Sequence, residues 1–366
     1  MASLAEIAEK ERRARQLMKE QGLSALVLST QVNFAWATGG GDSHVAISSE
    51  GGSASVVITP EARYIVCDNI EAGRIIEEEA AGLGFQLESY NWWDNRRQEI
   101  IERLAGGGKI GSDAAFPGAQ IIESSLAPYR VSLTMEEVDR YRWIGANTAE
   151  CMSEACRQIK PGMAEHEIAA LLDQKIIARG MIPNVTLIAT DERISKYRHP
   201  IPSDKKLEKY AMLVICARKW GLICSTTRLA HFGTLSDELR RKHNAVVEVD
   251  AAFIANTKVG ADVASVFNAA KAAYAKTGFG EEWQLHHQGG PTGYLGRDYR
   301  ASSATKDTVK MNQAFAWNPS ITGTKSEDTI IALDGKTEVI SMAKDWPYID
   351  VNVNGGIIRR ADILEL

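Results

Sequence analysis

Three of the seven histidines in this chain stand where an imidazole could do chemistry. Histidine is the side chain whose ordinary pKa lies closest to neutral pH, so it suits proton transfer. His199 precedes a proline, a context that on the residues alone is more typical of a turn than of a catalytic group. His286 and His287 precede Gly289-Gly290, where a ligand could approach the backbone closely and a substrate could bind. Because adjacent strand residues point to opposite faces, we expect only one of this pair to face a cavity.

The composition excludes several classes of partner. The chain has 366 residues, of which 45% are hydrophobic and 24% charged, enough for two domains with ordinary cores. Lys and Arg total 42 against 47 Asp and Glu, giving a net charge of −5. This balance provides no basic surface for nucleic acid or an anionic membrane, so we expect a small-molecule substrate.

The sequence also predicts a cytoplasmic protein. Its first 22 residues form a charged amphipathic helix without the apolar centre of a signal peptide, and no apolar run approaches the length of a membrane span. The five cysteines are odd in number and lie mostly in apolar segments, which favours reduced thiols. Cys216 and Cys224 lack the second pair that a cysteine metal site would need.

Residues 1–132 are predicted to form an α/β domain and residues 133–366 a second domain. In the first, strand-like runs alternate with helical stretches; the strands are expected at 25–28, 54–59 and 64–67, and helices at 71–81 and 95–105. Thr134 and Glu137 have the spacing of a capping box and predict a helix start just after the boundary.

The second domain contains a weak internal repeat. Gly162 and Gly260 each precede a predicted helix that ends at a glycine eighteen residues later, at Gly180 and Gly278. Each unit follows a longer helix and precedes strand-like sequence, which favours a pseudo-twofold α+β domain. Chance recurrence of amphipathic helices with glycine ends remains the alternative.

Four motifs resemble the creatinase/prolidase/aminopeptidase P family. They occur in the family's order within residues 133–335, and they are Ile159–Glu165 (IKPGMAE), Arg198-His199-Pro200, Gly221–Arg228 (GLICSTTR) and Gly323–Thr329 (GTKSEDT). The N-terminal half is similar more loosely, through Asn33–Gly39 (NFAWATG). The resemblance implies a creatinase-type α/β N-terminal domain followed by an α+β "pita-bread" catalytic-type domain.

The resemblance also implies a metal site that this chain has largely lost. Active metallopeptidases of the family hold two divalent ions with Asp, Asp, His, Glu and Glu; the matching positions here are Val214, Ser225, Gly290, Asn318 and Glu327. Of the family's four carboxylate ligands, only one is kept. Ser and Asn are weak oxygen ligands for a metal, and Val and Gly offer no side-chain ligand. We therefore expect no metal and no cofactor, unless a shifted loop brings His286 or His287 to the histidine position.

Creatinase, the metal-free member of the family, hydrolyses a C–N bond in creatine, and the resemblance implies matching roles here. His199 is the expected general acid/base, and Glu327 is expected to orient water or stabilise the imidazolium. An arginine fork at Arg297 suits a substrate carboxylate, although an ion pair with Asp298 is equally consistent. The full set of expected substrate-binding residues in this domain is Ser225, His286, His287, Tyr294, Arg297 and Asn318.

The segment around Gly39-Gly40-Gly41 is similar to a loop that reaches a neighbouring subunit's cavity in the family. Trp36 and His44 flank it and are expected to contact substrate across a homodimer. The glycine run lacks the following Lys-Ser/Thr of a phosphate-binding loop.

These features predict a metal-independent, creatinase-like hydrolase acting on a C–N bond of a small carboxylate-bearing compound. Three alternatives remain open. The first is an Xaa-Pro aminopeptidase or dipeptidase with an altered metal site. The others are a catalytically inactive binding module and a lyase or cyclase of a biosynthetic pathway.

Overall fold

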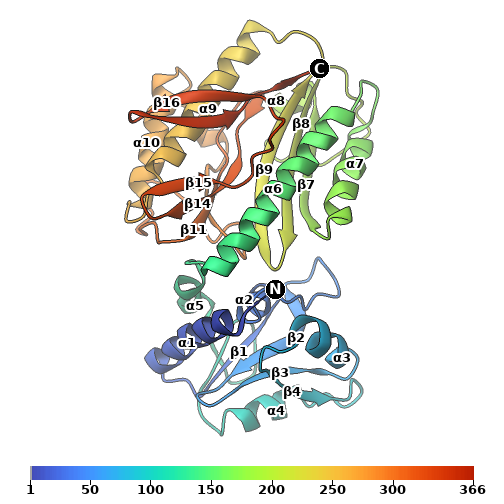
Figure 1. Ribbon diagram of the computed structural model, residues 1–366, viewed down its shortest axis with the longest axis vertical. Helices are drawn as coiled ribbons and strands as arrows, with labels where there is room; N and C mark the ends of the chain where they lie inside the picture. The colour runs from blue at the N-terminus through green and yellow to red at the C-terminus, as the bar shows by residue number, and fades with distance from the viewer. Residues whose placement is uncertain (1) are drawn as a thin grey trace. The chain divides into compact units, whose positions relative to one another are not determined.

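The computed structural model describes residues 2–366 and divides into two compact units (Figure 1). Unit 1 comprises the chain up to Glu137 together with Trp220–Leu222, and unit 2 comprises Val138–Lys219 and Ile223–Leu366. No helix in the described chain is both long enough and apolar enough to cross a membrane.

Unit 1 is built on a six-stranded sheet of order β4-β3-β2-β1-β5-β6. The strands are β1 (Ala25–Thr30), β2 (Gly51–Ile58), β3 (Arg63–Asp68), β4 (Gln86–Tyr90), β5 (Ile110–Ser112) and β6 (Gln120–Ile121). The helices are α1 (Leu4–Gln21), α2 (Gln31–Ala37), α3 (Ala72–Arg74), α4 (Arg97–Leu104) and α5 (Glu123–Arg130), with a π-helical turn at Ile75–Glu79. β2 runs antiparallel to both of its neighbours, and the other pairings are parallel. The predicted α/β class is therefore confirmed for this unit.

The helix expected over 71–81 is confirmed over residues 72–79, but only α3 is α-helical. The following turn is π-helical, so that Ala80 N donates to Ile75 O. Contacts outside the helix explain the distortion, because Arg74 donates to Asp42 O and Glu79 accepts from Asp42 N. The hydrogen bonds of Arg74 and Glu79 to Asp42 therefore outweigh the local preference of this segment for an α-helix.

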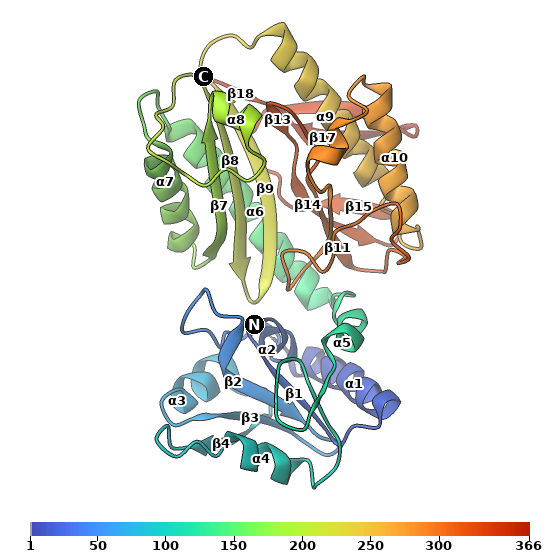
Figure 2. The ribbon, with the colours of Figure 1, turned by 180° about the vertical axis from the view of Figure 1, so that it is seen from behind.

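Unit 2 contains two halves, each with a pair of helices over a sheet (Figure 2). One half has α6 (Met135–Gln158), α7 (Glu165–Ala178), β7 (Ile182–Thr190), β8 (Tyr210–Lys219) and β9 (Leu222–His231). The other has α9 (Asp237–Asn256), α10 (Val263–Lys276), β10 (Gly289–Thr292), β11 (Gln313–Trp317), β14 (Asp328–Leu333) and β15 (Lys336–Val339). Shorter elements complete it: α8 (Glu192–Lys196), a 3-10 turn at Glu282–Leu285, β12 (Ser320–Ile321), β13 (Thr324–Lys325), β16 (Tyr348–Val353), β17 (Gly356–Ala361) and β18 (Leu364–Glu365).

The internal repeat is confirmed by equivalent backbone hydrogen bonds in the two halves. Gly162 N donates to Leu207 O at 2.7 Å, and Gly260 N donates to Val309 O at 2.9 Å. Both glycines have positive φ angles, 93° and 85°, which glycine adopts without steric cost. The same turn therefore starts α7 and α10, as a pseudo-twofold domain requires.

The predicted capping box is also present. Thr134 N donates to Glu137 Oε2 at 2.7 Å, and Glu137 N donates to Thr134 Oγ1 at 3.2 Å. These two bonds satisfy backbone donors that a helix start leaves unpaired.

Buried ion pairs fix the start of β14 in unit 2. Asp328 Oδ1 lies 2.9 Å from Arg228 Nη2, and Asp328 Oδ2 lies 2.6 Å from Arg360 Nη2. Arg360 also pairs with Asp250 of α9 at 2.6 Å. A charge network of this kind is costly to disturb, so it holds the residue before Asp328, which is Glu327, in a defined place.

Candidate functional site

The centre of the candidate site is the buried carboxylate of Glu327, which precedes β14. Glu327 Oε2 lies 2.7 Å from Lys325 Nζ and accepts a hydrogen bond of 2.7 Å from Thr227 Oγ1. Glu327 Oε1 lies 3.3 Å from Arg297 Nη2. Burial alone would raise the pKa of this carboxyl, but the charges of Lys325 and Arg297 outweigh it and the pKa is lowered. Glu327 is therefore an ionised carboxylate held by two cations.

Three imidazoles form a cluster beside these charges. His199 Nε2 and His286 Nε2 are 3.1 Å apart, and the ring centroids of His199 and His287 are 5.6 Å apart. His199 is exposed, whereas His286 retains 8% exposure. One ring nitrogen from each of the three lies within 4.8 Å of the others. The rings can therefore share a proton, a water or a ligand.

The expectation that only one of His286 and His287 faces this site is wrong. The alternation rule applies to strands, and both residues precede β10 in irregular backbone. Their ring centroids are 4.5 Å apart, and each ring also lies against His199.

All three histidines are held in the neutral state near pH 7. Burial lowers the pKa of His286 to about 2, and the nearby positive charge of Lys325 acts in the same direction. Burial and the charge of Arg297 lower the pKa of His287 to about 4. Burial followed by the Lys325 charge also lowers the pKa of His199, although Glu327 opposes this effect. A neutral, exposed imidazole such as that of His199 can accept a proton.

Several buried polar atoms at and around the site lack a hydrogen-bond partner among residues 2–366. They are His286 Nδ1, His287 Nδ1, Arg297 Nε and Asn318 Oδ1. Buried polar groups are normally satisfied, so their concentration here indicates water or a ligand. A cavity of about 10 Å³ beside Lys325 and His286 has room for about one water.

The positions matched to the family's metal ligands do not fit two divalent ions. Val214 packs in an apolar cluster, and the Ser225 hydroxyl donates to Cys216 Sγ at 3.2 Å. At Gly290 a Cβ atom would lie 2.4 Å from Tyr299 O, so the backbone fills the space that a side chain would need. Asn318 contributes a neutral amide.

Lys325 gives the stronger argument against a metal at Glu327. Its ammonium already occupies the cation position on the one remaining carboxylate, and Arg297 occupies the other oxygen. The three neutral imidazoles do offer nitrogen lone pairs. However, the charges of Lys325, Arg297 and Arg300 all act on them and disfavour a further cation at that place.

The remaining predicted residues are found in different surroundings. Arg297 contacts Glu327, and Tyr294 is buried in the loop that follows β10. In unit 1, Trp36 is fully buried within α2, so its indole is part of a core and is not presented by an exposed loop. His44 Nδ1 lies 2.6 Å from Asp42 Oδ1.

Reasoning from sequence missed Lys325 and Thr227. Lys325 could have been found from the sequence, because it stands two positions before Glu327. Residues two apart in extended backbone point to the same face, so the two side chains are expected to lie close together. Thr227 has no comparable local signal, since it comes from β9, a hundred residues away along the chain.

The chain matches the model of Metallopeptidase family M24 over residues 139–350 and that of the Creatinase/Prolidase N-terminal domain over residues 11–140. No curated protein matches it.

Solved structures share the fold across both units. An Xaa-Pro dipeptidase from Bacillus anthracis has a TM-score of 0.78 at 17% identity, with 98% of this chain and 100% of that chain covered. An X-Pro aminopeptidase from Thermotoga maritima gives 0.76 at 19% identity, with coverage of 97% and 99%. The N-terminal domain of the FACT complex subunit SPT16 from chickpea gives 0.68 at 12% identity, with coverage of 93% and 96%. At such identities the similarity establishes the fold alone.

Proposed function

Because this chain belongs to Metallopeptidase family M24, a family of hydrolases, we propose that it is a metal-independent hydrolase of a C–N bond in a small carboxylate-bearing compound. The observation that carries the proposal is the Lys325 ammonium, which lies 2.7 Å from Glu327 Oε2. An internal cation neutralises the last carboxylate of the expected metal set, so the site does not require an ion for charge balance.

The surplus of positive charge supports an anionic substrate. Glu327 carries one negative charge, whereas Lys325 and Arg297 pair with it and Arg300 adds a third cation nearby. A substrate carboxylate would offset this excess in a partly desolvated site. The unpartnered Nε–H of Arg297 can donate to it, as can Nδ1 of His287 in the tautomer that carries its proton there.

Within this proposal His199 moves the proton. Its neutral imidazole accepts a proton from a water molecule as the water oxygen bonds to the carbon of the C–N bond. The imidazolium is stabilised by the Glu327 charge, which raises the pKa of His199 against the lowering effects of burial and of Lys325. The proton then passes to the leaving nitrogen as the C–N bond breaks, so hydrolysis returns His199 to its starting state.

A panel of N-substituted amino acids and amidines tests this function. We expect turnover of a carboxylate-bearing substrate in the presence of a chelator, and loss of turnover when the carboxylate is replaced by a neutral amide. Xaa-Pro dipeptides belong in the same panel, because one structural relative is named an Xaa-Pro dipeptidase and another an X-Pro aminopeptidase. Cleavage of those dipeptides only after addition of a divalent ion would favour the peptidase alternative.

A catalytically inactive binding module is the second candidate. Its support is the loss of four expected ligands together with the shared fold of a FACT complex subunit. The converging ionisable groups at His199 and Glu327 favour the hydrolase.

We further propose a cytoplasmic homodimer. The loop of residues 42–50 in unit 1 exposes Val45 by 73% and Ile47 by 53%, and apolar side chains at such exposure suit a protein interface. All five cysteines are free thiols, in keeping with a reducing compartment. Sedimentation of a monomer with full activity would overturn the dimer.

A further inference from the structure

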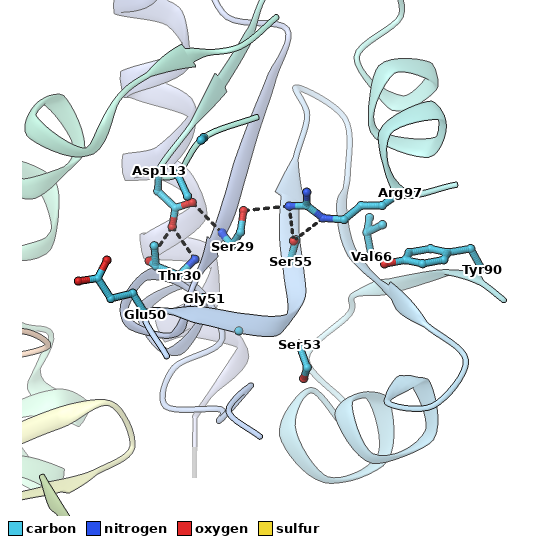
Figure 3. A pocket seen from close by; sticks show the side chains of 13 residues that line it. Ser29, Thr30, Glu50, Gly51, Ser53, Ser55, Val66, Tyr90, Arg97 and Asp113 are labelled. Carbon is cyan, nitrogen blue, oxygen red and sulfur yellow. Dashed lines mark hydrogen bonds between the residues drawn. The ribbon is translucent and has the colours of Figure 1, made fainter. Parts of the chain in front are cut away.

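A second polar pocket lies wholly within unit 1. It has a volume of about 600 Å³, within the range of small-molecule sites (Figure 3). Its lining is rich in hydroxyl side chains and includes one arginine; the residues used below are Ser29, Ser55, Tyr90, Arg97 and Asp113.

The pocket is placed where α/β folds commonly bind ligands. In the sheet, β2, β3 and β4 lie on one side of β1, whereas β5 lies on its other side. The chain passes from β4 through α4 to reach β5. The carboxyl ends of the parallel strands β1 and β5 therefore border a topological switch point. Ser29 lies near the end of β1, and Asp113 follows β5 directly.

Arg97 is the main reason to expect an anion here. Its Nη2 donates to Ser29 Oγ at 3.0 Å and to Ser55 Oγ at 2.9 Å, and its Nε donates to Ser55 Oγ at 3.3 Å (Figure 3). The guanidinium also lies over the Phe116 ring, 5.4 Å from its centre, which adds a cation–π contact. No carboxylate pairs with it, and its Nη1 has no partner among the described residues. Arg97 is thus a positioned, partly buried cation that makes no direct ion pair with the described residues.

The neighbouring acid, Asp113, acts on Arg97 through its charge but forms no direct ion pair with it. The Asp113 carboxylate accepts from Ser29 N, Thr30 N, Thr30 Oγ1 and Asn33 Nδ2 at 2.7 to 3.0 Å, so its oxygens are already occupied. Glu50 lies at the exposed rim, and its carboxylate points away from Arg97 (Figure 3).

Free donors surround the guanidinium. The Ser29 and Ser55 hydroxyls accept from Arg97, which leaves their own O–H groups to donate. The Tyr90 hydroxyl makes no hydrogen bond with the described residues, and burial raises its pKa, so it remains a donor.

We propose that this pocket binds the oxyanion of a small molecule, a carboxylate or a phosphate, through Arg97, Ser29, Ser55 and Tyr90. The site is separate from the groups around Glu327, and it would serve as an effector or accessory ligand site of unit 1. An oxyanion would supply the directly bonded anion that Arg97 lacks and would accept from the three hydroxyls at the same time.

Calorimetric titration of the full chain with inorganic phosphate and, separately, with succinate tests the proposal. We expect saturable binding of at least one probe, and the stronger of the two identifies the oxyanion class. Arg97→Met should weaken this binding by about 10-fold or more, as loss of a charge-assisted hydrogen bond predicts. Arg103→Met is the matched control, since Arg103 lies on the same helix with its side chain exposed and paired with Glu88.

Arg297→Met distinguishes this pocket from the site in unit 2, because it should leave the Arg97-dependent binding unchanged. If Arg97→Met fails to fold by circular dichroism, Ser55→Ala provides the second variant, with an expected loss of about 3- to 10-fold. The proposal is overturned if neither probe binds at millimolar concentration. It is equally overturned if Arg97→Met, or Ser55→Ala in its place, binds as tightly as the unchanged protein.

Discussion

Lys325 Nζ lies 2.7 Å from Glu327 Oε2, and the two side chains are only 5% and 3% exposed. A buried ammonium on a buried carboxylate takes over the charge that a divalent ion would provide. The account of the site depends on this pair, because it explains how one retained carboxylate stays ionised inside the protein without a metal.

Replacing Lys325 by Met tests that role. Only Arg297 would remain beside the Glu327 carboxylate, so its pKa should rise and activity should fall by about 10-fold or more. Lys325→Arg should retain most of the activity, since the charge is preserved. Steady-state kinetics of both variants, with the exposed Lys336→Met as control, give the comparison. Full activity of Lys325→Met would remove the pair from the mechanism.

His199→Ala should abolish turnover with little change in stability. General acid/base groups contribute about 10²- to 10⁴-fold to the rate, whereas this ring is exposed and makes a single hydrogen bond. Kinetics and thermal unfolding should be measured together, with the exposed His166→Ala as the matched control. A large drop in melting temperature would instead identify His199 as a structural residue.

The pH dependence of kcat/KM should show an acidic limb below pH 6.5. His199 must be neutral to accept a proton, and its pKa is lowered from 6.5 by burial and by Lys325. Activity is therefore present above that lowered pKa and is lost as the pH falls through it. An acidic limb that lies above pH 6.5 would show that the environment of His199 raises its pKa, and would contradict this prediction.

Glu327→Gln should lower kcat more than it changes KM. The amide keeps the size of the side chain but removes the charge that stabilises the His199 imidazolium in the transition state. Binding of a substrate analogue, measured in parallel, should change by less than the rate. Equal losses in affinity and rate would assign Glu327 to substrate anchoring.

Features set by neighbouring residues could be predicted from the sequence, and those set by distant contacts could not. The capping box at Thr134 and the repeated turns at Gly162 and Gly260 depend on a few adjacent residues, and all are present. The helix expected over 71–81 is present over 72–79, but its second part is a π-helical turn, where Arg74 and Glu79 contact a loop outside it.

The site shows the same division. Glu327 and His199 could be named from motifs, but the contact of both His286 and His287 with His199 depends on how an irregular segment approaches it. Trp36 was expected on a ligand-binding loop, whereas the packing of unit 1 encloses it completely.

Metal analysis of the purified protein by mass spectrometry, combined with an activity assay under chelation, tests whether this site works without a metal. We expect no stoichiometric Zn, Mn or Co, and activity that a chelator leaves unchanged. The residues explain why, since Gly290 has no room for a ligand and Lys325 occupies the cation position on Glu327. Near-stoichiometric metal that is lost in His199→Ala or Glu327→Gln, with activity removed by the chelator and restored by that ion, would show that the protein is a metal-dependent enzyme.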